Sequence, residues 1–236
     1  MQQGKFAVPS PSAGDRVHAL TKAGIASIPY VGNAGVELFA QIVAPPLERR
    51  RDKWMAEVGE ALLKLETEKR ITPESLSADE AFIDTLIQAS QAATRTSEVD
   101  KRLALRNAVL NSALPHAPSE TKRQLFLRLI DSLPVWSLRM LRLFADPLRW
   151  YAEHDKEPRK FGFTSCLEDV LLHAYPELQG EQPLYDQLWR GLYSEGLVGN
   201  DSLRVMMSAD GAYERRATEL GNALLVFVND PLDSKE

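Results

Sequence analysis

The chain has 236 residues, with 28 Lys and Arg against 33 Asp and Glu, which gives a formal net charge of -5. This length corresponds to one large domain or two small ones, and 44% hydrophobic with 26% charged residues is ordinary for a globular protein. The composition excludes a chain that is disordered throughout and a protein built from many membrane spans.

Residues 1–20 are rich in Pro, Ser and Gly and show no hydrophobic periodicity, so we expect a mobile tail. No basic end followed by an apolar run opens this stretch. A secretory signal has that pattern, so we expect a cytoplasmic protein.

An apolar segment, residues 23–46, follows the tail and carries a single charge, Glu37. Its prolines and glycines predict two pieces, the second a helix over 34–44. At 1.5 Å per residue this helix is about 16 Å long, against ~30 Å for the hydrocarbon core of a bilayer. A single membrane span is therefore not expected.

Helical periodicity continues after Pro45 and Pro46, where we expect one helix to end and the next to begin. The apolar stripe of this next helix contains Trp54, Val58, Leu62 and Leu65. Ser77 and Glu80 have the spacing of a capping box and predict another helix start. The helix that follows carries Phe82, Leu86, Ala89 and Ala93. A further helix, with Leu103 in its apolar stripe, is predicted from about 98 to 113.

The rest of the chain also begins with predicted helices, over 119–133 and 134–145. Ser165 and Glu168 form a second predicted capping box. A helix ending at Gly196 and a last helix capped by Thr218 are predicted further on. Between them, residues 203–207 and 213–216 are predicted to form a short β-hairpin.

This order of elements resembles a winged helix-turn-helix domain over residues 119–229. In this resemblance one helix ends in Gly-Leu-Val at 196–198, and the closing helix is introduced by Thr-Glu-Leu-Gly at 218–221. The expected fold class is mainly α: an N-terminal helical region, then a winged-helix-like domain with a short β-hairpin. The expected divisions are a tail over 1–20, a helical region over 21–116 and a winged-helix-like domain over 117–236.

Three segments, 107–115, 129–147 and 218–228, resemble uncharacterised bacterial proteins related to the abortive-infection alpha group. This resemblance implies a role in bacterial defence against phage. It offers no catalytic residues to carry over.

No chemical motif is evident in the sequence. Asp169 and His173 lie four residues apart on one predicted helix, but two such groups are fewer than a metal site requires. Cys166, the only cysteine, cannot form an internal disulfide and is predicted to pack as a small apolar side chain. Arg139 and Arg142 are interpreted as the rim of a core helix. We expect no catalytic residue, no cofactor and no metal, and a protein that is not an enzyme.

Charge argues against a primary role in binding nucleic acid, because phosphate contacts require clustered Lys and Arg. Residues 119–236 contain 14 Lys and Arg against 19 Asp and Glu, whereas the rest of the chain has 14 of each. Five residues remain candidates for nucleic-acid contact: Gln187, Arg190, Arg204, Arg215 and Arg216.

The apolar segment leaves two alternatives open, a buried core element or a surface that contacts a membrane or a partner. Candidates for such contact are Ile28, Tyr30, Val36, Phe39, Val43, Arg49, Arg50 and Arg51. The first interpretation is a non-enzymatic protein that binds protein partners or itself. The second is a membrane-active effector that uses residues 23–46, and the third is a DNA-binding regulator.

Overall fold

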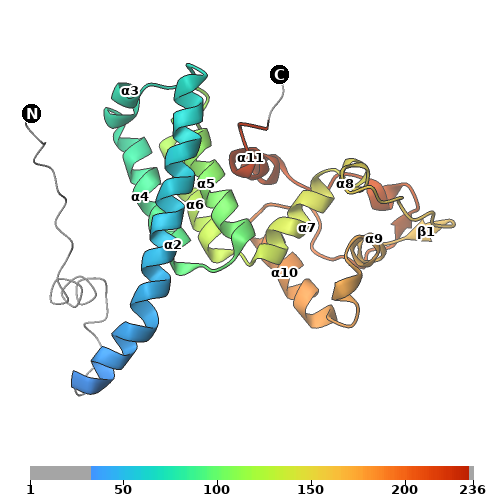
Figure 1. Cartoon of the computed structure of the whole chain (residues 1–236). Coiled ribbons are helices and arrows are strands. Elements are labelled where there is room, and N and C mark those ends of the chain that lie inside the picture. The colour runs from blue at the N-terminus through green and yellow to red at the C-terminus, as the bar shows by residue number, and fades with distance from the viewer. Residues whose placement is uncertain (1–32, 234–236) are drawn as a thin grey trace, which may run out of the picture. The chain divides into compact units, whose positions relative to one another are not determined.

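A computed structural model of the chain describes residues 33–233. The chain divides into two compact units, Met1–Lys53 and Trp54–Glu236. The boundary expected between residues 116 and 117 lies inside the second unit. The described residues are mainly helical, as Figure 1 shows, and their one sheet has two short strands. The mainly α class is therefore confirmed, and the expected tail over 1–20 lies outside the described residues.

The elements have the following bounds. The helices are α2 (Asn33–Thr67), α3 (Pro73–Ser77), α4 (Glu80–Arg95), α5 (Val99–Ala113), α6 (Glu120–Ser132), α7 (Val135–Ala145), α8 (Pro147–Glu153), α9 (Leu167–Ala174), α10 (Gln182–Ser194) and α11 (Glu219–Val228). The strands are β1 (Thr164–Ser165) and β2 (Met207–Ser208), and two 3-10 turns are η2 (Pro176–Leu178) and η3 (Gly211–Tyr213).

Helix α2 continues through Pro45 and Pro46. The predicted break at these prolines is therefore wrong. A proline has no N–H to donate, so the carbonyl groups of Gln41 and Ile42 lose their partners inside the helix. Both residues are exposed, and water can supply the missing donors.

The part of α2 that belongs to the second unit carries the predicted apolar stripe. The exposed fractions of Trp54, Val58 and Leu65 are 1%, 3% and 0%. The indole Nε1–H of Trp54 donates to the hydroxyl of Ser90 on α4 at 2.9 Å. This bond satisfies the one polar group that the indole brings into the core. The stripe is confirmed.

Helices α4, α5 and α6 lie side by side in the second unit (Figure 1), and each contributes buried residues to its core. The buried residues of α4 include Phe82, Ala89 and Ala93, as the periodicity predicts. Leu103 of α5 does not follow its predicted stripe, because its side chain is 44% exposed. In α6, Phe126 packs against Phe227 of α11, with 5.4 Å between the ring centroids.

The capping box predicted at Ser77 and Glu80 is wrong. Ser77 is the last residue of α3, and α4 is capped by Asp79, whose carboxylate accepts from the N–H of Phe82 at 3.0 Å. The capping box in this region is formed by Thr72 and Ser75. The box predicted at Ser165 and Glu168 is likewise displaced by one residue, as described below.

Polar side chains of α5 bind the carbonyl end of α11. The amide of Asn111 donates to the carbonyl groups of Phe227 and Asn229, at 3.0 and 2.9 Å. The amide of Asn107 donates to Val228 at 3.0 Å. The last carbonyl groups of a helix have no partners within it, so these amides replace water at the end of α11.

The two-stranded sheet joins segments that are distant in sequence. Thr164 lies opposite Ser208, and Ser165 lies opposite Met207. The predicted hairpin of 203–207 with 213–216 is therefore wrong. Residues 213–216 have other partners: Tyr213 is the last residue of η3, and the N–H of Arg216 donates to the carbonyl of Phe144 on α7 at 2.7 Å.

Several helix ends follow the predicted chemistry. Thr218 caps α11 by accepting from the N–H of Gly221 at 3.1 Å. Gly196, which follows α10, has a φ of 70°, a conformation that favours glycine. At α9, however, the cap is Cys166, and the carboxylate of Asp169 accepts from its N–H at 3.2 Å. Cys166 is buried at this helix start, as expected.

Candidate functional site

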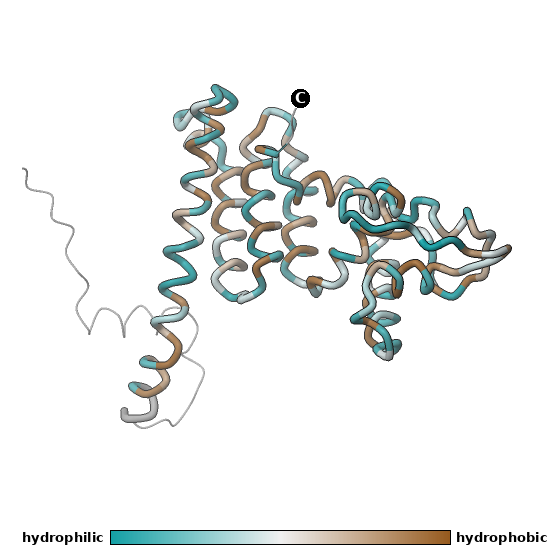
Figure 2. The backbone as a smooth tube through the Cα atoms, turned by 45° about the vertical axis from the view of Figure 1, so that its right-hand side comes forward, coloured by the Kyte–Doolittle hydropathy of each residue, from teal (hydrophilic) through white to brown (hydrophobic). Residues whose placement is uncertain are grey.

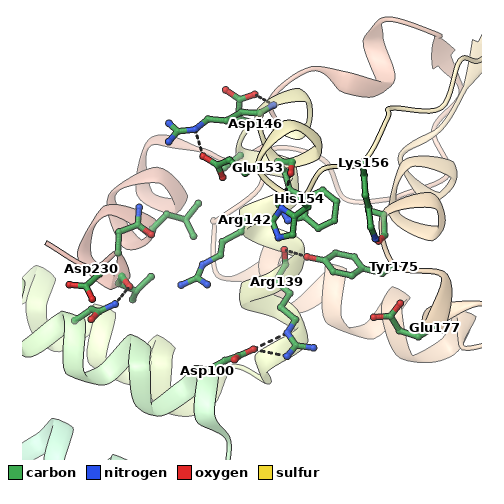
Figure 3. A pocket seen from close by; sticks show the side chains of 18 residues that line it. Asp100, Arg139, Arg142, Asp146, Glu153, His154, Lys156, Tyr175, Glu177 and Asp230 are labelled. Atoms are coloured by element: carbon green, nitrogen blue, oxygen red, sulfur yellow. Dashed lines mark hydrogen bonds and ion pairs between the residues drawn. The ribbon is translucent and has the colours of Figure 1, made fainter. Parts of the chain in front are cut away.

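A cavity of about 710 Å³ lies in the second unit, lined by residues of α5, α7, α8, the α9–η2 region and α11. Its charged lining contains Asp100, Arg139, Arg142, Asp146, Arg149, Glu153, Lys156, Glu177 and Asp230. Figure 3 shows these side chains around an open centre. The volume lies within the roughly 300–1,000 Å³ that is typical of small-molecule sites.

Helix α8, which lines one side of the cavity, is absent from the sequence prediction. Asp146 begins it, because its carboxylate accepts from the N–H of Arg149 at 3.2 Å and Pro147 takes the first helical position. Aspartate at the cap and proline at the first position are a standard helix start. The Asp-Pro pair is therefore the signal that could have predicted this helix.

Most charged groups of the lining are paired. Arg139 of α7 lies 2.6 Å from the carboxylate of Asp100 on α5, and Arg149 lies 2.6 Å from Glu153 one turn further along α8.

The other two paired carboxylates of the lining bind arginines that do not line the cavity. Asp146 pairs with Arg215, and Asp230 pairs with Arg106 of α5 at 3.0 Å. These four carboxylates are therefore already compensated by guanidinium groups.

Aromatic rings form a second part of the lining. The ring of His154 stacks on Trp150, with 4.0 Å between centroids, and Trp150 meets Tyr175 edge to face at 5.1 Å. Nδ1 of His154 lies 2.7 Å from the carbonyl of Trp150, which can only accept, so Nδ1 carries the proton. Burial raises the pKa of Tyr175 to about 12. Lys156 lies over the Trp150 ring and donates to the carbonyl of Ala174 at 2.8 Å.

Arg142 and Glu177 are the two charged lining residues whose side chains make no hydrogen bond or ion pair with any of residues 33–233. In Figure 3 the guanidinium of Arg142 projects into the open part of the cavity, and no dashed line reaches it. Its side chain is exposed, although its neighbours Leu141 and Leu143 are fully buried. The sequence interpretation of Arg139 and Arg142 as a rim gave no indication that they line a cavity with α8 and α11.

The predicted contact residues of the apolar segment are only partly described. Ile28 and Tyr30 lie outside the described residues, and the side chain of Val36 is outside them too. Phe39 is 45% exposed, and Val43 is half-buried. In Figure 2 the first described turns of α2 are coloured as hydrophobic and the next turns as hydrophilic.

Two neighbours of Phe39 are missing from the sequence prediction. Leu38 is 59% exposed and Ile42 is 62% exposed. Hydropathy alone could not separate them from core residues, because exposure of an apolar side chain depends on the packing around it. In the part of the chain that the structure describes, no helix is both long and apolar enough to cross a bilayer.

Three arginines predicted for contact, Arg49, Arg50 and Arg51, follow these turns, and we call them the basic cluster. Arg49 and Arg51 are exposed, and Arg50 is half-buried. Arg51 pairs with Asp52 at 3.2 Å, and both side chains are more than half exposed. Such an exposed pair contributes little to stability, roughly 0–1 kcal/mol.

The five residues predicted for nucleic-acid contact are not gathered as a free basic surface. Arg204 donates to Asp186 of α10 at 2.6 Å and to Glu168 of α9 at 3.0 Å. The hydrogen bond to Asp186 raises the pKa of Arg204 above its ordinary value.

Two more of these arginines are held by contacts within the chain. Arg215 pairs with Asp146. Arg216 is mostly buried and donates to the carbonyl of Gly211. Gln187 and Arg190 are exposed on α10.

The acidic and histidine side chains of residues 33–233 include no cluster of three or more that could hold a metal ion. Asp169 and His173 bind different groups: Asp169 accepts from the hydroxyl of Ser165 at 2.9 Å, and Nδ1 of His173 lies 2.9 Å from the hydroxyl of Tyr151. Both side chains are therefore engaged in local hydrogen bonds.

Searches for similar proteins found no match to this chain among protein families, curated proteins or solved structures.

Proposed function

We propose that the protein acts by binding another protein through the N-terminal part of α2, and not by catalysis. One observation carries this proposal: Leu38, Phe39 and Ile42 are large apolar side chains that are 59%, 45% and 62% exposed. They are spaced one, three and four residues apart, so they lie on one side of a helix. We call these three residues the α2 apolar face.

The proposed partner has an apolar groove with acidic side chains at one end. Helices that dock into grooves use anchors at i, i+3 and i+4, which is the spacing of the α2 apolar face. Burying such a side chain fully contributes roughly 1.5–3 kcal/mol. Arg49 lies seven residues after Ile42, about two turns further along the same side of α2, and would face the acidic end of the groove.

A membrane surface is the second candidate occupant of the same face. Basic residues next to exposed apolar residues are typical of helices that lie on anionic membranes. Glu48 and Asp52 partly cancel the charge of the basic cluster, and this weakens attraction to anionic lipid. For this reason we favour a protein partner.

Two finer points belong to the proposal. The elements from α6 to α11 are proposed as a winged-helix-like module that serves protein contacts, because three of its four candidate arginines pair with carboxylate or carbonyl groups of the chain. A setting in bacterial defence against phage is proposed on the resemblance of three sequence segments alone.

The test compares the full chain with Phe39→Asp and with Val226→Asp. Val226 of α11 is 68% exposed and provides a control for adding a charge at an exposed apolar position. Each tagged protein is used to capture partners from the source cells and is also floated with vesicles of anionic phospholipid. We expect one stoichiometric protein to be captured by the wild type and by Val226→Asp, and to be lost with Phe39→Asp.

Two results would contradict the proposal. Capture of the same protein by Phe39→Asp would show that the α2 apolar face is not the contact. Flotation of the wild type with vesicles, lost in Phe39→Asp, would favour the membrane alternative. Circular dichroism of both variants checks that they are folded.

A further inference from the structure

We propose that the cavity between α7, α8 and α11 binds a small molecule that carries one carboxylate or phosphate group, and that Arg142 holds this group.

The first argument is the charge balance of the lining. Arg139 and Arg149 each have a carboxylate partner at 2.6 Å. Arg142 has none among residues 33–233, and Figure 3 shows its guanidinium in the open part of the cavity. A guanidinium offers a planar set of donors that matches two oxygens of a carboxylate or phosphate. Arg142 is therefore the guanidinium of the lining that is available to an anion. Lys156 also has no carboxylate partner among residues 33–233, but it donates to the carbonyl of Ala174 at 2.8 Å and lies over the Trp150 ring.

The second argument is the position of Arg142 in the fold. It follows the buried Leu141 and precedes the buried Leu143, and both have exposed fractions of 0%. Because these neighbours fix the face that α7 presents to the core, they also fix where Arg142 leaves the helix. The backbone at Arg142 is therefore already ordered in the folded protein, and ligand binding does not have to supply the conformational entropy of ordering it.

The third argument concerns the rest of the ligand. Besides charged groups, the lining contains Ala145, Trp150, Leu225 and Val228. A cavity of about 710 Å³ has room for a body of several carbon atoms as well as the anionic group. These apolar side chains are a minority of the lining, so the body of the ligand has a small apolar contact area.

The number of carboxylates limits the charge of the ligand. Five of them line the cavity, and four have guanidinium partners. Glu177 is the one without such a partner. The carboxylate of Glu177 would repel a ligand with several negative charges, whereas the positive charge of Arg142 would compensate a single anionic group. The cavity therefore favours a monocarboxylate or a monophosphate over a polyphosphate.

The test is a titration of the full chain with benzoate, phenyl phosphate and tripolyphosphate by calorimetry at low ionic strength. We expect benzoate or phenyl phosphate to bind more tightly than tripolyphosphate, and the stronger of the two to identify the ligand as carboxylate or phosphate. Arg142→Gln should lower the affinity about tenfold or more. Arg142→Lys should lower it by less, because lysine keeps the positive charge but cannot donate two parallel hydrogen bonds as the guanidinium does.

Two further variants distinguish binding at Arg142 from nonspecific electrostatic attraction of the anion to the protein. Arg190→Gln removes one exposed positive charge from α10, outside the cavity, and should leave the affinity unchanged. Glu177→Gln removes the unpaired carboxylate and should raise the affinity. Since Arg142 and Glu177 make no hydrogen bond that the fold depends on, both variants should fold, which circular dichroism checks.

Three results would overturn the proposal. Equal binding by Arg142→Gln and wild type would remove Arg142 from the site. Tightest binding of tripolyphosphate, with equal losses in Arg142→Gln and Arg190→Gln, would indicate diffuse charge attraction. No heat of binding with any of the three probes, together with no shift of the Arg142 Nε–H resonance in nuclear magnetic resonance spectra, would exclude an oxyanion site.

Discussion

Gly221 lies in the first turn of α11, close to the backbone of Leu197. A Cβ atom at this position would lie 2.3 Å from the carbonyl oxygen of Leu197 and 3.3 Å from a methyl group of Leu141. The first of these distances is far below van der Waals contact, and backbone cannot move aside as a side chain can. Glycine is thus required here by close approach and not by its conformational freedom.

We predict that Gly221→Ala destabilises the protein. Forcing extra atoms into a packed interior typically costs about 1–3 kcal/mol. Gly191, inside α10, provides the matched control, because nothing lies within 4 Å of its added Cβ. Gly191→Ala should stabilise by about 0.5–1 kcal/mol through helix propensity. Urea denaturation followed by circular dichroism measures both, and the same sign of change in the two variants would contradict this account.

At the scale of elements, the end of α11 depends on its neighbour α5. Asn111 donates to the carbonyl groups of Phe227 and Asn229, and Arg106 pairs with Asp230 just beyond the helix. A positive charge near a helix C-terminus is favourable, because the exposed carbonyl groups make that end negative. Two helices far apart in sequence are therefore joined by polar as well as apolar contacts.

We predict that Asn111→Ala lowers the free energy of unfolding by about 1–3 kcal/mol, because carbonyl groups at the end of α11 lose their donor. Asn111→Asp should be at least as destabilising, since a carboxylate would face carbonyl oxygens. Asn222→Ala removes an amide from an exposed part of α11 and serves as the control. Hydrogen exchange of the α11 amides is the measurement. Equal protection of α11 in Asn111→Ala and wild type would show that this cap is dispensable.

The prediction of elements from sequence succeeded where the signal is local. Thr218 at the start of α11 and Gly196 after α10 are both assigned correctly, because a cap depends on only a few neighbouring residues. The capping boxes at Ser77 and Ser165 fail by small displacements, since a competing side chain, Asp79 or Asp169, lies within two to four residues of the predicted cap.

The prediction failed where partners come from distant parts of the chain. The strand β2 pairs with β1, which the spacing of residues 203–216 cannot show. The cavity is a similar case, because Arg142 and Asp230 are brought to it by the packing of α7, α8 and α11. Periodicity identifies which face of α7 is buried, but it does not identify what lies beyond the edge of that face.

At the scale of the whole molecule, buried and half-buried tyrosines link stability to pH. Burial raises the pKa values of Tyr151 and Tyr213 above the ordinary value near 10.0. Burial also raises the pKa values of Tyr175 and Tyr185 to about 12, helped in Tyr185 by its hydrogen bond to Glu168. These phenols lie on or beside α8, α9, α10 and η3, so most of the C-terminal elements contribute one.

We therefore predict that the melting temperature falls as pH rises from about 9 to about 11. Below the pKa of tyrosine in the unfolded chain, the phenols are neutral in both states and the full stability is present. Above it, the unfolded chain ionises first, so stability is lost until the pH reaches the raised folded pKa, on the order of 1 kcal/mol per buried phenol. Tyr175→Phe keeps the ring but removes one phenol, and its loss of stability over this range should be smaller by about that amount. Melting followed by circular dichroism, with tyrosinate absorbance recorded in parallel, makes the comparison. Ionisation of all the tyrosines before any fall in melting temperature would contradict it, because the phenols would then titrate without unfolding.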